Sequence, residues 1–265
     1  MQVRLFLIIV AIMAALALKP TATFAQKISW VDVKCCATDI SVGKDASVWI
    51  VGTDKRLHRY DGQNWVADKQ AGGVTRVAVA PDGSPWITNT NDQIFHHANG
   101  KWQRVNGSAT DIALGANGAI WIVNRKGAIY MRAGTTWQQV NGKAKRIAVD
   151  PEGNAWVVNA GGALYRWDGT KFIKLPGGNG ADIGIGADGS VWMTTRRANV
   201  YKWNGKAWVQ HPGALGAIAA GRTPRGLFSK AGIASATGTS NGSWSGRAER
   251  ALAPLAAVEE GQAFE

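Results

Sequence analysis

The stretch that decides the fold runs from Val105 to Val140 and reads VNGSATDIALGANGAIWIVNRKGAIYMRAGTTWQQV. Its apolar runs are four to six residues long and are separated by turns that contain glycine, a pattern typical of short strands rather than helices. Asn117-Gly118 separates the first two runs, and this dipeptide favours a tight hairpin because both residues tolerate a positive φ. The stretch therefore predicts four antiparallel strands, named A to D in chain order.

The same text returns at a fixed phase along the chain. Tryptophans at strand B recur every 35 to 37 residues, and a second aromatic series follows each of them by 16 residues; the two series are Trp49, Trp86, Trp121, Trp156, Trp192 and Trp65, Trp102, Trp137, Phe172, Trp208. Four strands in such a repeat make one blade of a β-propeller. A single blade would expose both faces of its sheet, so we expect the blades to stack radially with the tryptophans as wedges.

The repeat weakens toward the C-terminus. Ala217 begins a sixth copy in phase, with Phe228 where the other blades have tryptophan. We expect an all-β propeller of six four-stranded blades, five clear and the sixth degenerate. A strand around Trp30 would close the ring by joining the C-terminal blade, which removes exposed sheet edges. Alternatively, Trp244 supplies the last strand of blade six and Trp30 lies on an extra strand.

The N-terminus has the features of a secretory signal peptide. Arg4 precedes an apolar run from Leu5 to Leu18, and Thr23 and Ala25 occupy the small-residue positions of a cleavage site. The run is shorter than the ~20 residues that a bilayer span needs. We expect a secreted or periplasmic protein with no membrane span. Its expected parts are a signal peptide at 1–25, the propeller at 26–246 and a helical or poorly ordered tail at 247–265.

Composition excludes disorder and indicates a basic protein. The chain is 46% apolar and has 30 Lys and Arg against 18 Asp and Glu, a formal charge of +12. Cys35 and Cys36 are its two cysteines and are adjacent, without metal-ligand spacing. A vicinal disulfide, an intermolecular bridge and two free thiols all remain open.

Nothing in the sequence indicates catalysis. The four histidines, His58, His96, His97 and His211, belong to no metal or nucleophile motif. We therefore expect no enzyme activity, no cofactor and no metal site.

The expected topology sorts the charges onto two faces. In such a blade the B-to-C loops and the D-to-A connections emerge on one face, and the A-to-B and C-to-D turns on the other. The first set carries mostly cations: Lys55, Arg56, Arg125, Lys126, Arg196 and Arg197 in the loops, and Lys34, Lys69, Lys143 and Lys145 in the connections. The second set carries acids: Asp45, Asp61, Asp82, Asp150, Glu152, Asp168 and Asp188. We expect one basic face that attracts anionic ligands.

The loop residues on that face are the candidate ligand site. Paired cations on alternate blades suit the phosphate or carboxylate groups of a polysaccharide or lipopolysaccharide, and Asn124 and Asn159 offer amide hydrogen bonds. The candidate ligand-binding residues are Lys55, Arg56, Asn124, Arg125, Lys126, Asn159, Arg196 and Arg197. Basic loops with aromatics also suit single-stranded nucleic acid, but export argues against nucleic acid as a partner.

One further pattern lies at the start of strand A. Charges of alternating sign occupy the same register in five blades: Asp39, Arg76, Asp111, Arg146 and Asp182. Because strand A lines the channel of a propeller, the pattern predicts a structural ring of ion pairs at the channel mouth, interrupted at Ala217.

The repeated phrase Val-Asn-Gly-x-Ala-x-x-Ile-Ala, followed by Asn/Glu-Gly-x-x-Trp and Gly-x-Ile/Leu-Tyr, resembles the tectonin family of β-propellers. It occurs at 105–140 and again at 140–175, and the resemblance covers about Trp30 to Pro212. It implies a propeller of about six blades with lectin-like relatives that bind glycans or lipopolysaccharide. Residues 48–62 also resemble the periplasmic sensor propellers of two-component regulators. The alternative is therefore a sensor or interaction propeller with a protein partner, and a propeller enzyme is a weaker one.

Overall fold

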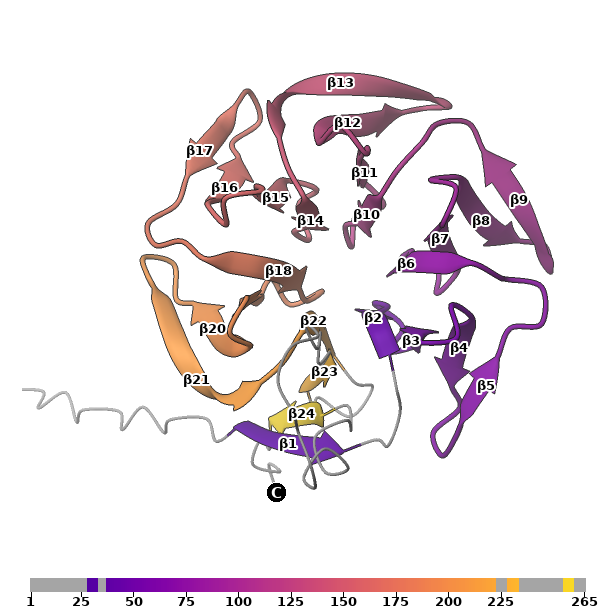
Figure 1. The fold of residues 1–265 in the computed structure, drawn as a ribbon, viewed down its shortest axis with the longest axis horizontal. Coiled ribbons are helices and arrows are strands. Elements are labelled where there is room, and N and C mark those ends of the chain that lie inside the picture. The colour runs from indigo at the N-terminus through magenta and orange to yellow at the C-terminus, as the bar shows by residue number, and fades with distance from the viewer. Residues whose placement is uncertain (1–27, 33–36, 223–227, 234–254, 260–265) are drawn as a thin grey trace, which may run out of the picture.

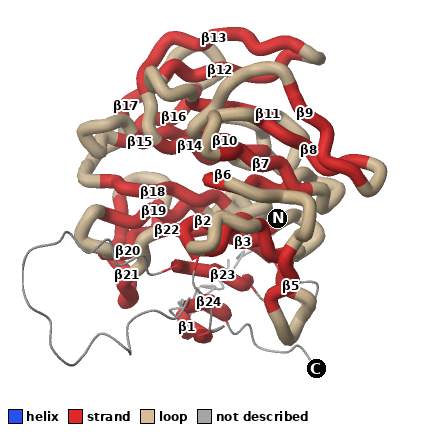
Figure 2. The backbone as a smooth tube through the Cα atoms, turned by 45° about the vertical axis from the view of Figure 1, so that its right-hand side comes forward, coloured by secondary structure: helices blue, strands red, loops and turns tan. Residues whose placement is uncertain are grey.

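The computed structural model describes residues 28–32, 37–222, 228–233 and 255–259. All regular structure in these residues is β-strand, as Figure 2 shows. A helix long and apolar enough to cross a membrane is absent from this part of the chain. The predicted signal peptide at 1–25, Lys34, both cysteines and Trp244 lie outside the described residues.

Five four-stranded antiparallel sheets stand radially around a central channel (Figure 1), and each runs in chain order from the channel outward. Blade 1 comprises β2 (Ala37–Val42), β3 (Val48–Gly52), β4 (Leu57–Tyr60) and β5 (Trp65–Ala67). Blade 2 comprises β6 (Val74–Val79), β7 (Pro85–Asn89), β8 (Ile94–Ala98) and β9 (Lys101–Val105). Blade 3 comprises β10 (Asp111–Leu114), β11 (Ile120–Val123), β12 (Ala128–Ala133) and β13 (Thr136–Lys143).

Blade 4 comprises β14 (Arg146–Val149), β15 (Ala155–Val158), β16 (Leu164–Trp167) and β17 (Phe172–Lys174). Blade 5 comprises β18 (Gly180–Ile185), β19 (Val191–Thr195), β20 (Asn199–Trp203) and β21 (Trp208–Ala214). The prediction of an all-β propeller with five clear four-stranded blades is confirmed.

A sixth four-stranded sheet lies between blades 5 and 1. Its order from the channel outward is β22 (Ala217–Arg222), β23 (Phe228–Ile233), β24 (Leu255–Glu259) and β1 (Ile28–Asp32). The strand around Trp30 is thus outermost and pairs with β24, as expected of a strand that closes the ring. β24 lies inside 247–265, where we expected a helical or poorly ordered tail; its run Leu-Ala-Ala-Val is apolar enough to serve as a short strand.

The tryptophans of strand B fill the spaces between blades, as predicted. Trp121 of blade 3 is fully buried and meets Trp167 and Phe172 of blade 4, with ring centroids 5.8 and 6.4 Å away. Its indole Nε1 donates to the carbonyl of Gly153 in the next blade at 3.0 Å. Each such ring removes a large apolar area from water and ties two blades together.

Candidate functional site

The face formed by the B-to-C loops and D-to-A connections carries the cations that the sequence placed there. The six loop cations are all exposed: Lys55, Arg56, Arg125, Lys126, Arg196 and Arg197. Three acids that the sequence analysis left out of this face, Asp54, Asp68 and Asp92, lie on the same loops and connections. The positive charge is concentrated in blades 3 to 5: residues 109–215 have thirteen Lys and Arg against six Asp and Glu, whereas blade 1, at 37–73, has five of each.

The opposite face carries the acidic turns. Their carboxylates mostly close their own turns: Asp61 accepts the N–H groups of Gln63 and Asn64, and Asp168 accepts those of Thr170 and Lys171. These hydrogen bonds hold the pKa of both carboxyls below the usual range. Local turn geometry accounts for these acids without a ligand.

The loop cations are not equivalent. Arg125 forms a bidentate pair with Asp92 of blade 2, with Nε and Nη2 at 2.6 and 2.9 Å from the carboxylate oxygens, and this pairing raises the pKa of Arg125. Arg196 instead donates from Nη2 to the backbone carbonyl of Ala160 in blade 4 at 2.7 Å. Among the described residues no carboxylate pairs with Arg196 or Arg197. Asp92 therefore neutralises the charge of Arg125 at the surface, whereas the exposed charges of Arg196 and Arg197 have no carboxylate partner among the described residues.

A groove of about 730 Å³ lies between blades 4 and 5. It brings Arg196 and Arg197 together with Tyr201 of β20 and Trp208 of β21, and its other wall is the connection at 176–179. The combination of aromatic surface with a few polar and charged groups is typical of ligand pockets. Nε1 of Trp208 is buried without a hydrogen-bond acceptor.

The same groove recurs one blade earlier. A cavity of about 430 Å³ between blades 3 and 4 is lined by Asn159, Tyr165 and Phe172, with Lys143 and Lys171 at its edge. The positions of Asn159, Tyr165 and Phe172 correspond to those of Thr195, Tyr201 and Trp208 in the next repeat, 36 residues later. The repeat therefore produces a repeated groove.

Blade 3 has the equivalent residues Asn124, Tyr130 and Trp137 at the same positions of its repeat. Asn124 donates from Nδ2 to the hydroxyl of Tyr130 at 3.5 Å, and Trp137 donates from Nε1 to the carbonyl of Asn106 at 2.6 Å. Asn124 also closes its own loop, because Oδ1 accepts the N–H groups of Lys126 and Ala128. Asn124 therefore uses its amide oxygen to hold the loop and an amide N–H to contact Tyr130, which leaves fewer hydrogen-bonding groups for a ligand.

Glycine makes room for the aromatic side chain in all three blades. Gly107, Gly142 and Gly177 have positive φ angles of 121°, 141° and 80°. A Cβ on them would lie 2.7 Å from Trp137, 3.2 Å from Phe172 and 3.2 Å from Trp208, respectively. The connection can therefore pass close to the ring only where it has no side chain.

Sequence reasoning missed the aromatic half of these grooves. The signal was present: Tyr130, Tyr165 and Tyr201 recur at steps of 35 and 36, whereas blades 1 and 2 have His58 and Phe95 there. In blade 2 the indole of Trp102 donates to Asp68 at 3.2 Å, and no equivalent acid stands in blades 3 to 5. The grooves with a tyrosine hydroxyl are those of the electropositive blades.

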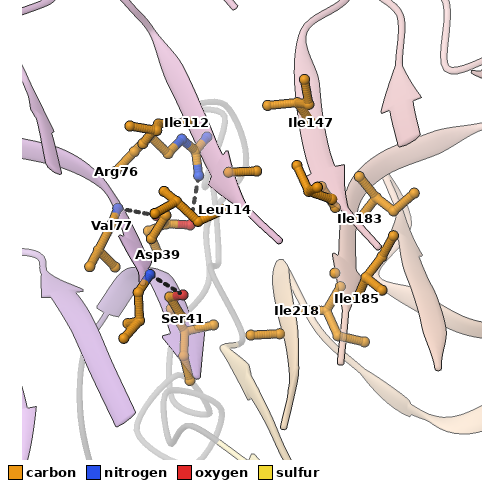
Figure 3. Close-up of a pocket in the computed structure, with 18 of the residues that line it drawn as sticks. Asp39, Ser41, Arg76, Val77, Ile112, Leu114, Ile147, Ile183, Ile185 and Ile218 are labelled. Carbon is orange, nitrogen blue, oxygen red and sulfur yellow. Dashed lines mark hydrogen bonds and ion pairs between the residues drawn. The ribbon is translucent and has the colours of Figure 1, made fainter. Parts of the chain in front are cut away.

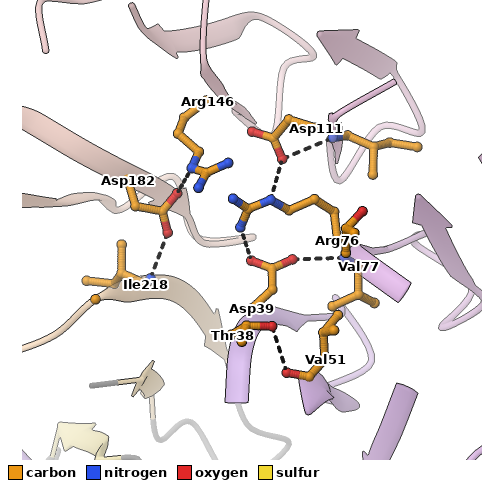
Figure 4. Close-up of polar contacts among 12 residues, drawn as sticks. Thr38, Asp39, Val51, Arg76, Val77, Asp111, Arg146, Asp182 and Ile218 are labelled. Atoms are coloured by element: carbon orange, nitrogen blue, oxygen red, sulfur yellow. Dashed lines mark hydrogen bonds and ion pairs between the residues drawn. The ribbon is translucent and has the colours of Figure 1, made fainter. Parts of the chain in front are cut away.

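The ring of ion pairs predicted at the channel mouth is present in part (Figure 4): among the described residues Arg76 pairs with Asp39 and Asp111, and Arg146 with Asp182, but no ion pair joins Asp111 to Arg146. Arg76 Nη1 donates to Asp39 Oδ1 at 2.9 Å, and Nε lies 3.6 Å from Asp111. Arg146 Nε lies 3.4 Å from Asp182. The sequence did not reveal a second role: each aspartate also accepts a backbone N–H of the next blade, from Val77, Ile147 and Ile218.

The three aspartate side chains of this ring are buried, and burial changes their pKa values. Burial raises the pKa of Asp39 to about 6 and that of Asp111 to about 8, although the charge of Arg76 acts in the opposite direction. Burial also raises the pKa of Asp182. The channel beside them holds a cavity of about 90 Å³, and Leu114 and Ile185 are among the residues that line it (Figure 3). The ring therefore joins blades, and the space inside it is small.

No histidine is among the residues that line the two grooves of blades 4 and 5. His96 stacks on Trp86 with centroids 4.4 Å apart, and burial lowers its pKa. Ser84 Oγ lies 3.0 Å from His96 Nε2 but is also 2.6 Å from Asp82, to which it donates. A nucleophilic serine needs the base between itself and the acid, so this order does not activate Ser84. Within the described chain no three His, Cys, Asp or Glu side chains are grouped to hold a metal.

The fold is a β-propeller with repeated grooves between its blades. The tectonin domain model matches residues 37–133, 73–165, 108–180 and 144–247, so the chain belongs to the tectonin family. A solved structure titled "YCF48 bound to D1 peptide" is similar over 78% of this chain and 79% of its own, with 18% identity and a TM-score of 0.47. None of the curated proteins matches the chain.

Proposed function

We propose that the protein is an exported, noncatalytic glycan-binding protein whose ligand occupies the grooves of blades 3 to 5. The ligand class is an anionic polysaccharide or lipopolysaccharide, bound without a cofactor. Export follows from the predicted signal peptide at 1–25.

The observation that carries the proposal is the groove between blades 4 and 5. Tyr201 and Trp208 offer flat apolar surface for the C–H face of a sugar ring, and Arg196 and Arg197 offer charge-assisted hydrogen bonds.

Recurrence supports the same function. Similar grooves in successive blades give several weak sites, and a repeating polymer engages several of them at once. The excess of positive charge in blades 3 to 5 draws anionic chains to that sector of the face.

The test is binding of purified residues 26–265 to neutral glycans, acidic polysaccharides and lipopolysaccharides at low salt and at about 0.5 M salt, where the Debye length falls to a few ångström. We expect binding of specific acidic glycans that survives high salt and is lost with Trp208→Ala. Binding that vanishes with salt for every anion alike would contradict a dedicated site.

A protein partner is the second candidate. Val66, Ile173 and Val209 lie on outer strands and are 53%, 42% and 44% exposed. Ile173 and Val209 occupy the same position in adjacent blades, which suits a partner that packs on the rim. Val209→Gln with Ile173→Gln would weaken a rim partner and leave glycan binding unchanged.

A further inference from the structure

We infer, on the basis of the proposed function, that one linear acidic oligosaccharide crosses from the groove of blade 4 to the groove of blade 5, with an anionic group of one sugar seated at Arg196 and Arg197. The two grooves are then subsites of a single extended site rather than independent sites of a multivalent lectin. The shared chemistry of the anionic group is that of a carboxylate or phosphate.

The two grooves are neighbours, and one hydrogen bond links the loops beside them. Asn159 lines the groove of blade 4, and its chain neighbour Ala160 accepts the hydrogen bond from Arg196. Arg196 in turn lines the groove of blade 5. A ligand that follows the polar groups from Asn159 to Arg196 therefore passes over the loop of blade 4 without leaving the protein surface.

The charge at the blade 5 end is uncompensated. Arg196 uses Nη2 on a neutral carbonyl, which fixes the side chain and leaves other guanidinium donors available. Arg197 is exposed beside it in the same groove. Arginine presents a planar fork that matches a carboxylate or phosphate. Blade 3 offers no equivalent, because Asp92 already occupies the fork of Arg125.

The blade 4 end has a different character. It has no arginine, and Lys143 donates from Nζ to the carbonyl of Lys126 at 3.0 Å. Asn159 lines this groove, and because its Oδ1 accepts the N–H of Ala163, its amide N–H groups are the candidate neutral donors. With Tyr165 and Phe172, this end suits a neutral sugar ring, or the uncharged edge of an acidic one.

Chain length is the property that separates a two-groove site from isolated grooves. The experiment is calorimetric titration of the full mature chain with oligogalacturonates of two to eight residues and with carboxyl-reduced chains of the same lengths. A phosphorylated monosaccharide and free galacturonate separate phosphate from carboxylate as the anionic group. We expect affinity for the acidic series to rise at least about tenfold once the chain reaches the second groove.

Variants assign the two ends. Arg197→Gln is expected to weaken short and long acidic chains alike. Tyr165→Phe with Lys171→Gln is expected to weaken only long chains and so abolish the length dependence. Arg104→Gln on β9 of blade 2, an exposed position with the same charge change, is the matched control and should change neither. Unchanged thermal unfolding of each variant shows that folding is intact.

The outcomes distinguish this inference from the proposed function. Equal affinity at all lengths would overturn the two-groove site and leave glycan binding standing. Carboxyl-reduced chains that bind as tightly as acidic ones would overturn the anionic subsite alone. Failure of every glycan to bind would remove both.

Discussion

Arg76 Nη1 of blade 2 donates to Asp39 Oδ1 of blade 1 at 2.9 Å, although 37 residues separate them in the chain. The same guanidinium lies 3.6 Å from Asp111 of blade 3. One side chain therefore joins three consecutive blades at the channel. The carboxylates outweigh the lowering effect of burial and hold the pKa of Arg76 above its usual range, so the guanidinium stays charged.

Arg76→Met should destabilise the protein strongly. Removal of one partner from a buried ion pair leaves uncompensated charge and costs about 3–5 kcal/mol. Urea unfolding monitored by tryptophan fluorescence measures the loss. The exposed Arg104→Met should change stability by less than about 0.5 kcal/mol, and equal effects of the two variants would show that the ring is not structural.

The ring should also make stability fall as pH rises. Asp39 and Asp111 have folded pKa values of about 6 and about 8, above the value of 3.8 that applies to an unperturbed aspartate. Their contribution is fully present below the unfolded pKa of 3.8 and is lost as pH rises from there, up to about pH 6 for Asp39 and about pH 8 for Asp111. Melting temperature should therefore decrease from pH 5 to pH 8.5. Asp111→Asn should flatten that decrease, and an unchanged slope in this variant would argue against Asp111 as its source.

Gly142→Ala should reduce stability and disturb the groove of blade 4. Its φ of 141° is strained for any residue with a Cβ, and that Cβ would press on Phe172 at 3.2 Å. Gly169→Ala is a matched control, because its φ is 103° but nothing lies within 4 Å of the new Cβ. Both should lose about 1–2 kcal/mol from backbone strain, and only Gly142→Ala should lose ligand binding. Ligand binding reduced equally by both would place the site elsewhere.

The two arginines of equivalent loops should respond differently. Arg197→Gln removes an uncompensated guanidinium and should weaken an acidic glycan about tenfold or more, since hydrogen bonds to charged groups contribute about 1.5–3 kcal/mol. Arg125→Gln exposes the carboxylate of Asp92, so any loss should be restored in the double variant with Asp92→Asn. Surface plasmon resonance on an immobilised acidic glycan measures both. A larger effect for Arg125 alone, not restored by Asp92→Asn, would contradict this assignment.

The architecture could be predicted because the tryptophan spacing reports it directly. Trp49 to Trp192 lie at one position of a repeated blade, and the alternation from Asp39 to Asp182 shows which residues meet at the channel. Both patterns follow from a repeat in which each residue type has one structural task. The interblade hydrogen bonds donated by the backbone of Val77, Ile147 and Ile218 could not be predicted, because almost every residue type has a backbone N–H and its presence does not distinguish one position from another.

The site was predicted less completely, since the loop cations look alike in sequence. The sequence pairs Arg125 with Lys126 and Arg196 with Arg197 as equal sites, but the fold brings Asp92 to Arg125 from 33 residues away. The spacing of Trp208 predicts packing between blades and gives no sign of a groove, because a residue that lines a groove and one that fills a core recur with the same period. Contacts between neighbouring blades decide whether a loop cation is paired and whether an aromatic side chain lines a groove, and these contacts are visible only in the folded structure.

The most direct test of the glycan-binding account is an NMR titration of the ¹⁵N-labelled mature chain with an acidic oligosaccharide. The account predicts shifts of the backbone signals of 176–179 and 195–201 and of the indole N–H of Trp208, while the indole N–H of Trp102, which donates to Asp68, stays unchanged. Shifts confined to the opposite face, around Asp82 and Asp188, or no shift at millimolar ligand, would contradict it.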